Sequence, residues 1–417
     1  MLGVKAEKVS LQLESGKISQ IPLSRLSVED QAFIKENSWP LPPAWKGWPS
    51  DLQVTLAKIR IKDVGKLESW YTYHSEHFEV AAEAELGNTC VKEICRLLEG
   101  VYLLMEKSPW GILATPKNER FRIELYQTLD SYTQNGGPAN SAGVYLTDRA
   151  VFMVPFKSLG IYESSAGWRQ NRDGSSKTIV HELTHMLMAD AVSYLPPWLI
   201  ESAAEYMELI PLRTSVFRPG SLERELVKHN QFMIDRIRGG RPASLEQVFS
   251  LNLYEWQSGG VSRPSSTPTP EGENKNIQIG GISPTNSITG FYHSGLLLSY
   301  YFIHLDGEGD ASRLQRFIAA SQKNHKVIEQ FEKDYQDYQQ NWKDFAAKSE
   351  VEEISPGQYR FPENLNPPKA PVYPFGNFAD EEVRFAELDV LLEGRTTNEV
   401  LAEAQKALQG LKLKVTP

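Results

Sequence analysis

The period with which apolar residues recur changes along the chain. The first part contains both strand-like and helix-like periods, and the second part is mainly helix-like. Between residues 68 and 156 the pattern predicts strand, helix, strand, helix, strand and strand. One strand is expected over Trp70–Ala81, and the first helix over Thr89–Glu106. Residues 142–146 and 150–154 then read as two short strands joined by a turn. This order is typical of an α+β fold.

From residue 175 onward the helical period dominates. We expect helices within 175–250, including Leu222–Arg238, and four more after a long interruption. Those later helices are predicted at 290–305, 311–322, 324–348 and, as a final amphipathic helix, near 397–411. The interruption, 257–288, is rich in Ser, Thr, Pro, Gly and Asn, and is either a surface insertion or a lid over a cleft.

The N-terminal segment has a pattern of its own. Val9–Leu13 alternates like a strand, residues 14–17 turn, Ile18–Ile21 returns, and Ser27–Ile34 forms a capped helical turn. This segment resembles the C-terminal half of a small barrel-like homology domain first known from a fungal actin-patch protein and widespread in bacteria of the planctomycete kind. The resemblance implies an interaction or packing role, with a possible protein partner, and a missing first half upstream of Met1.

Length and charge limit the classes of function. A chain of 417 residues exceeds one core and suggests several domains. A net charge of −9 argues against a nucleic-acid partner, because phosphate binding needs a basic surface. No stretch approaches the roughly 20 apolar residues of a membrane span. We expect an interaction segment at 1–38, a linker at 39–67, subdomains at 68–210 and 211–350, and an extension at 351–417.

The run His181-Glu182-Leu183-Thr184-His185 carries the strongest chemical signal. Two imidazoles four residues apart lie on one face of an α-helix, so both can hold one metal ion. Glu182 points toward the same side, where it could take a proton from metal-bound water. The competing interpretation is a helix with two surface histidines.

A third ligand is expected on the next helix. Pro196 and Pro197 end one helix and start another, which carries Glu201 and Glu205 one turn apart. A catalytic zinc takes three protein ligands and keeps one open position, and Glu201 is the best-placed carboxylate. Glu205 could accept the other ring N–H of a ligand histidine. The competing interpretation is two solvated helix carboxylates.

H-E-x-x-H followed by Trp198-Leu-Ile-Glu201-Ser-Ala-Ala-Glu205-Tyr206 resembles the gluzincin metallopeptidases, and most of all the peptidase MA-like domains of bacterial proteins. The resemblance implies a zincin-like (thermolysin-type) α+β fold with a mixed sheet and a mainly helical C-terminal half. It also implies Zn²⁺ held by His181, His185 and Glu201, with Glu182 as general base. Glu205 would support the site by accepting a hydrogen bond from the second ring nitrogen of a ligand histidine. One departure is Ser202, where the family usually has glycine.

The developing oxyanion needs a donor besides the metal. Tyr292, at the start of an apolar helix opening near Gly290, is our first candidate by resemblance, and His293 our second. Core packing is the alternative for Tyr292. The same resemblance implies an edge strand that pairs with the substrate backbone, for which 142–146 and 150–154 are candidates; an ordinary hairpin is the alternative.

The remaining reactive side chains point to no second centre. Cys90 and Cys95 are five residues apart in a helix and are poorly placed to bridge each other. His74 and His77 bracket Glu76 in a predicted strand and are read as surface residues, with a second metal site as the alternative.

The leading hypothesis is a zinc-dependent peptidase, with an endopeptidase preferred because no G-x-M-E-N-type exopeptidase signature is present. The first alternative is a binding or scaffold protein that uses a gluzincin-like fold without turnover, motivated by the N-terminal segment and Ser202. The second is a structural zinc site, which would need a fourth protein ligand. The resemblance to bacterial envelope and secreted proteins favours export, although no signal peptide opens the chain.

Overall fold

The structure is a computed structural model of the chain. It describes residues 3–5, 8–12, 18–31, 45–165, 167–171, 176–213, 215–236, 243–250, 256, 278–279, 286–348, 352–355, 358–360, 368–374 and 388–415. The chain divides into two compact units: residues 1–41 with 316–394, and residues 42–315 with 395–417. The first contains the three-stranded antiparallel sheet β1–β2–β3, the hairpin β16–β17 and most of helix α10. Its strands are Gly3–Lys5, Lys8–Gln12, Ile18–Pro22, Glu352–Ser355 and Gln358–Arg360.

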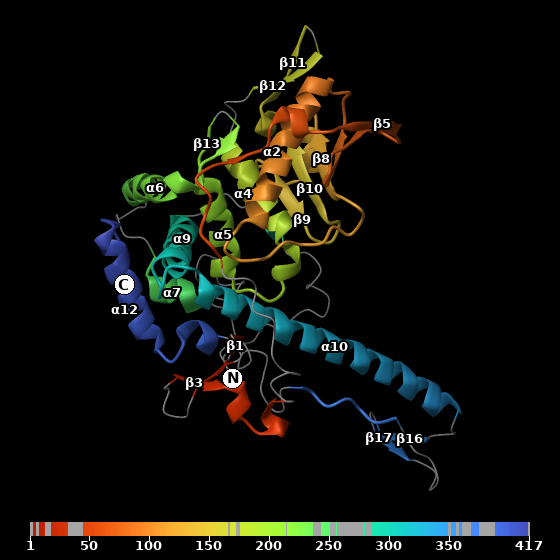
Figure 1. The fold of residues 1–417 in the computed structure, drawn as a ribbon. Helices are drawn as coiled ribbons and strands as arrows, with labels where there is room; N and C mark the ends of the chain where they lie inside the picture. The colour runs from red at the N-terminus through yellow and green to blue at the C-terminus, as the bar shows by residue number, and fades with distance from the viewer. Residues whose placement is uncertain are drawn as a thin grey trace. The chain divides into compact units, whose positions relative to one another are not determined.

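The second unit is built on a mixed sheet of six strands, which the two-residue strand β15 extends at one edge (Figure 1). The strand order is β15-β9-β10-β8-β7-β6-β5, with parallel pairing only between β7, β8 and β10. The strands are β5 Lys62–Leu67, β6 Trp70–His74, β7 Phe78–Ala82, β8 Phe121–Tyr126, β9 Val144–Leu146, β10 Val151–Pro155 and β15 Gln278–Ile279. An α+β fold with a mixed sheet and a mainly helical C-terminal half is thereby confirmed.

Helices supply the rest of this unit (Figure 1). They are α2 Asn88–Glu106, α3 Leu129–Gln134, α4 Ser176–Leu187, α5 Pro197–Leu209, α6 Leu222–Arg236, α7 Leu245–Ser250, α9 Asn286–His304 and α12 Thr397–Gly410. Short strands complete it: β4 Leu52–Gln53, β11 Ile161–Ser164, β12 Gly167–Gln170, β13 Leu212–Arg213 and β14 Val216–Phe217. Among the described residues, no helix is both long and apolar enough to cross a membrane.

Two predictions of single elements were wrong. The expected strand Trp70–Ala81 is a hairpin, because Ser75–His77 turn the chain back so that β6 pairs antiparallel with β7. The expected helices 311–322 and 324–348 are one helix, α10, over Ser312–Lys348, since nothing between them breaks the helical path. The helix expected at 290–305 begins earlier, at Asn286. Most of 257–288, including the question of a lid, lies outside the described residues.

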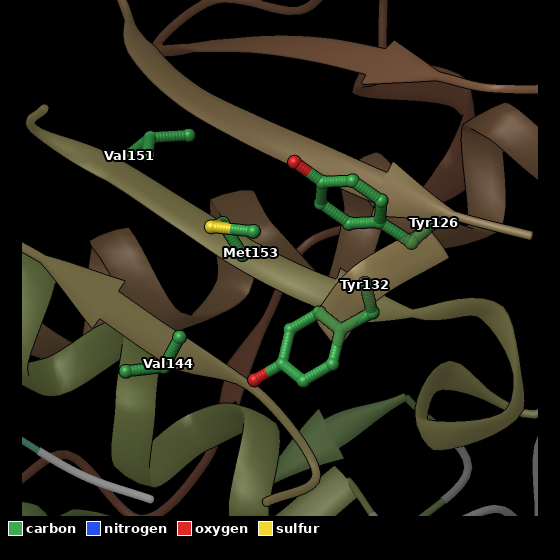
Figure 2. Close-up of a cluster of buried hydrophobic side chains, with 5 residues drawn as sticks. All are labelled: Tyr126, Tyr132, Val144, Val151 and Met153. Atoms are coloured by element: carbon green, nitrogen blue, oxygen red, sulfur yellow. The ribbon is translucent and has the colours of Figure 1, made fainter. Parts of the chain in front are cut away.

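The core of the sheet packs around β10, the only strand in which all five residues are buried among those described. Val151 and Met153 point into a cluster with Tyr126, Tyr132 and Val144, which Figure 2 shows. Because successive side chains point to opposite faces, the equally buried Phe152 and Val154 must fill the other face. β10 is therefore covered on both sides and holds the neighbouring β9 in place.

Helix α5 links the sheet-bound helix α4 to the C-terminal helices. It contacts α4 on one side and α9 on the other, and Pro197 starts it at the first helical position. Ser202, the departure noted above, is fully buried, and its hydroxyl bonds the hydroxyl of Ser299 on α9. Gly295 of α9 lies opposite it, where an added Cβ would lie 3.4 Å from the Ser202 side chain, so the glycine allows α5 and α9 to approach closely here.

We expect Gly295→Val to destabilise the protein by about 1–3 kcal/mol, because a branched side chain would press on Ser202 and the Trp198 carbonyl. Thermal unfolding measures the change. Gly295→Ala is the matched control: its single methyl meets ordinary contact distances and removes a helix-destabilising glycine, so stability should hold or rise. Equal loss in both variants would contradict this account of the α5–α9 contact.

Candidate metal centre

Three side chains from α4 and α5 meet in the interior of the second unit. His181 and His185 lie one turn apart on α4, and Glu201 reaches them from α5. The Nε2 atoms of the two histidines are 3.2 Å apart, and Oε2 of Glu201 lies 3.3 Å from Nε2 of His185 and 3.7 Å from Nε2 of His181. All three residues form a buried cluster that could hold a metal ion.

The spacing of these atoms fits zinc. Ligand atoms at bond lengths of about 2.0–2.1 Å in a tetrahedron are roughly 3.3 Å from one another. The three observed separations of 3.2, 3.3 and 3.7 Å bracket that value. Oε2 of Glu201 is also buried with no hydrogen-bond partner among the described residues, which is costly for a carboxylate unless a cation lies beside it. Two nitrogens and one oxygen of this kind suit Zn²⁺.

The charges within the cluster are coupled. Burial opposes ionisation of Glu201, but His185 and His181 outweigh it and lower the pKa of this carboxyl to about 2. Burial likewise opposes protonation of His181, yet the neighbouring carboxylates of Glu201 and Glu208 raise its pKa well above the usual value. Burial lowers the pKa of His185. In the absence of a metal, the positive charge that balances Glu201 therefore sits mainly on His181.

Glu182 lies beside the cluster and is buried. It is 4% exposed, and its Oε2 has no hydrogen-bond partner among the described residues. Burial raises the pKa of this carboxyl to about 8, while a hydrogen bond from the Tyr145 backbone acts in the opposite direction. A carboxylate with such a pKa can take up a proton near neutral pH, which is what a general base must do.

Tyr292 reaches the same region from the first turns of α9. Its ring centroid is 6.2 Å from that of His181, and the Glu201 carboxylate lies close enough to act on its hydroxyl through charge. Burial, followed by the charge of Glu201, raises the pKa of Tyr292 well above its usual value, so the hydroxyl keeps its proton. The first oxyanion candidate is thus a protonated donor next to the cluster.

His293, the second candidate, lies elsewhere. It is 1% exposed, and its Nε2 accepts a hydrogen bond from the Asn230 side-chain amide on α6 at 2.9 Å. Its ring is 5.6 Å from that of His229, and burial lowers its pKa to about 3. His293 is therefore a neutral imidazole with its proton on Nδ1, packed between α9 and α6.

The side of His181 opposite the cluster faces two carboxylates of α5. Nδ1 of His181 is 3.8 Å from Oε1 of Glu205, the expected partner, and 3.4 Å from Oε2 of Glu208. Of these two, only Glu208 forms a hydrogen bond with the ring; Glu205 acts on it through charge. Sequence reasoning missed Glu208. The signal was present, since Glu201, Glu205 and Glu208 are spaced four and three residues apart, along one helix face.

A cavity of about 450 Å³ opens beside these carboxylates. It is lined by Lys177, Glu205, Glu208, Leu209, Glu225, Lys228, His229, Phe232, Met233, Thr289 and Tyr292. His229, also missed in the sequence, has a buried Nε2 without a hydrogen-bond partner among the described residues, and burial lowers its pKa. The cavity adjoins the metal centre through Tyr292 and Glu208, but the three candidate ligands themselves do not line it.

The two candidate edge strands differ in position. β10 is interior, with β8 on one side and β9 on the other, so residues 150–154 offer no free edge. β9 is the outer strand of the six and contacts α4, with β15 paired to it at Tyr145 and Leu146. Of the two, β9 is the strand nearer the edge, but β15 already occupies its outer side at Tyr145 and Leu146.

The other reactive side chains take structural positions. His74 and His77 are half-buried and not surface residues: His74 contacts Glu79 at 3.1 Å, and His77 contacts Glu99 at 2.6 Å. Both histidines form local side-chain hydrogen bonds, and the groups that could hold a metal among the described residues do not include them. Cys90 and Cys95 are free and buried.

No protein-family model matches the chain, and no curated protein matches it either.

We expect Glu208→Gln to weaken Zn²⁺ binding by about 10–100-fold, because loss of the carboxylate that bonds Nδ1 frees the His181 ring to turn. Glu205→Gln should weaken it only a few-fold. Competition against a chelating dye measures both affinities. Glu225→Gln, on the cavity wall but without contact to His181, is the control. A larger loss in Glu205→Gln than in Glu208→Gln would reverse the assignment.

A second prediction concerns pH in metal-free protein. The folded state holds the Glu182 proton up to a pKa of about 8, whereas the ordinary value is 4.5, so wild-type stability should fall as pH rises between these values. Glu182→Gln removes this dependence and should be the more stable protein above pH 8, by up to a few kcal/mol, and no more stable at pH 4. Thermal unfolding in chelator tests this, with the exposed Glu119→Gln as control.

Proposed function

We propose that the chain is a zinc-dependent peptidase of the gluzincin type, with a thermolysin-like core and a preference for internal peptide bonds. The observation that supports it best is the triad His181, His185 and Glu201, whose ligand atoms are spaced 3.2–3.7 Å apart, with Glu182 buried beside it. Motif and geometry are independent arguments for the same three ligands. Export from a bacterial cell belongs to the same proposal and rests on the resemblance alone.

Zinc held by the triad would supply Lewis-acid chemistry, lowering the pKa of a water molecule and polarising the scissile carbonyl. Glu182 accepts the proton of the attacking water and returns it to the leaving amine. Its burial, which raises its pKa to about 8, suits both directions of transfer. Tyr292, which keeps its proton, donates its hydroxyl hydrogen to the oxyanion.

β9 is the strand along which a substrate backbone would lie in this proposal, taking the place of β15, which pairs with β9 at Tyr145 and Leu146. β9 is short and borders α4, and the Tyr145 backbone already bonds the Glu182 carboxylate. Main-chain pairing of this kind binds peptides largely independently of sequence, which leaves side-chain selection to nearby pockets. The cavity lined by His229 and Phe232 adjoins the centre and is the described pocket best placed for that selection.

The alternative function is a metal-binding protein without turnover. Its support is burial: His185 is 0% and Glu201 7% exposed, and the three ligands line none of the described cavities. A structural zinc ion would need a fourth protein ligand. Around Nε2 of His181, the described residues offer only three metal ligands, the side chains of His181, His185 and Glu201. Because a fourth protein ligand is lacking among them, this grouping favours a catalytic site over a structural one.

The test is Glu182→Gln. We expect this variant to bind one zinc ion per chain as tightly as the wild type, and to lose at least about 10²-fold in hydrolysis of casein, since a positioned base contributes about 10²–10⁴-fold. Zinc content by elemental analysis and cleavage by gel or fluorescence give the two readouts. Unchanged turnover in the variant would remove Glu182 from the mechanism.

Absence of casein and peptide-library cleavage by the zinc-loaded wild type would favour the binding protein instead.

Tyr292→Phe separates the remaining candidates for the oxyanion donor. It removes one hydroxyl from the side of Glu201 and should lower kcat with little change in zinc content. His293→Gln should act mainly on stability, because His293 is fully enclosed between α9 and α6.

A further inference from the structure

Another cavity, of about 880 Å³, opens in the second unit, and none of the candidate metal ligands lines it. Its walls are the turn between β6 and β7, the second half of α2 and the stretch 53–62. Its volume is about twice that of the cavity beside the metal centre, and it falls within the roughly 300–1,000 Å³ of small-molecule sites. We call it the β6–β7 cavity.

Four lysine and arginine side chains line the β6–β7 cavity: Lys58, Arg60, Lys62 and Arg120. The first three occupy every second position of the run Lys58-Ile-Arg-Ile-Lys62, and all three are exposed. The isoleucines between them are buried or half-buried, so the run is anchored through its apolar positions. In a chain whose net charge is −9, this run is a local reversal of charge.

These cations have few partners of opposite charge. The side chains of Lys58, Arg60 and Lys62 form no ion pair and no hydrogen bond with any of the described residues. Arg120 donates from Nε to the Ser75 carbonyl at 3.0 Å, which fixes its guanidinium group. Its one ion pair is with Glu119, whose side chain is 92% exposed, and such a pair is weak in water.

The carboxylates in the wall leave most of this positive charge unmatched. Glu99 is 8% exposed and binds His77 twice, at the backbone N–H (3.0 Å) and at ring Nδ1 (2.6 Å). Glu106 pairs with Lys107, which does not line the cavity, at 3.4 Å. Of the acidic side chains in the wall, Glu76 is the one that has no partner among the described residues. The cavity therefore carries an excess of cations.

Glu99 also orients a further polar group of the wall. The His77 ring stacks on Tyr102 at a centroid distance of 3.7 Å and an interplanar angle of 12°, while Glu99 holds its Nδ1. The ring is thus fixed, yet its Nε2 has no hydrogen-bond partner among the described residues. A protonated imidazole donates from both nitrogens, so Nε2 can donate to an anion while Nδ1 donates to Glu99.

We infer that the β6–β7 cavity binds a small organic phosphate. The phosphate lies among the four cations and His77, and the apolar part of the ligand packs against Ile59, Ile61 and Leu103. A phosphate is favoured over a carboxylate because a dianion with three acceptor oxygens can use several cations at once. The inference is independent of the proposed peptidase activity, since the two sites share no residue.

Isothermal titration calorimetry of the full chain with phenyl phosphate tests the inference. The wild type should bind one equivalent with a dissociation constant below about 1 mM. Inorganic phosphate should bind at least about tenfold more weakly, because it has no apolar part to bury. Benzoate should also bind at least about tenfold more weakly, because it carries one charge.

Paired substitutions locate the binding site. Arg60→Gln together with Lys62→Gln should weaken phenyl phosphate binding at least about tenfold, through the loss of two charge-assisted hydrogen bonds. Lys46→Gln together with Lys66→Gln changes the net charge equally outside the cavity, and is the matched control that should leave affinity unchanged. All four positions are exposed, and circular dichroism checks that each variant is folded.

Two further readouts separate this cavity from the metal centre, because a bound zinc ion could itself attract phosphate. Affinity should be the same in zinc-loaded and in chelator-treated protein. In NMR spectra, the His77 ring nitrogens should shift on addition of phenyl phosphate, whereas those of His325 on α10 should not.

Four outcomes would overturn the inference. They are no binding of phenyl phosphate up to about 10 mM, an equal loss in the control variant, binding that requires zinc, and an unmoved His77 signal at saturation. Benzoate that binds as tightly as phenyl phosphate would overturn the assignment of a phosphate ligand.

Discussion

The candidate centre depends on the burial of one carboxylate between two imidazoles. Glu201 is 7% exposed, its Oε2 lies within 3.7 Å of two histidine nitrogens, and no hydrogen-bond donor completes the coordination of that oxygen among the described residues. A buried charge of this kind is tolerated only when its partners are held in place and carry compensating positive charge. The packing of α4 against α5 supplies the first condition. A protonated His181 or a bound cation supplies the second.

Helix α5 is therefore buried almost all round, unlike an ordinary surface helix. Trp198 and Tyr206 are fully enclosed, and the Tyr206 hydroxyl is bonded by Trp48 on one side and contacts His304 on the other. These aromatic contacts fix the rotation of α5 about its axis. Rotation decides whether Glu201 faces α4, so residues far from the centre contribute to its geometry. The Ser202–Ser299 hydrogen bond and Gly295 do the same on the α9 side.

Local patterns in the sequence predicted the elements that carry the centre. The H-E-x-x-H run, the proline pair before α5 and the position of Glu201 each depend on spacing within one helix, and the structure brings those three side chains together. Contacts between helices were harder to predict from the sequence. His229 lies on α6 and reaches the cavity only because α6 packs beside α5, a relation that no period within either helix encodes. The hairpin at Ser75–His77 was missed because its short turn lacks glycine and proline, so the two strands read as one.

The two faces of His181 show how one helix can organise both the ligands and their support. Glu201 meets Nε2 of this ring, and Glu208, two turns later on α5, meets Nδ1. A neutral imidazole carries its proton on only one nitrogen. A carboxylate at Nδ1 holds the proton there and leaves the Nε2 lone pair directed at the cluster. The stripe of three glutamates on α5 thus selects the tautomer that binds a metal, and it does so from a single helix face. Because Glu205 and Glu208 cannot both be bonded by one N–H, the second carboxylate is left in a crowded, buried position, and burial together with Glu208 raises its pKa to about 8.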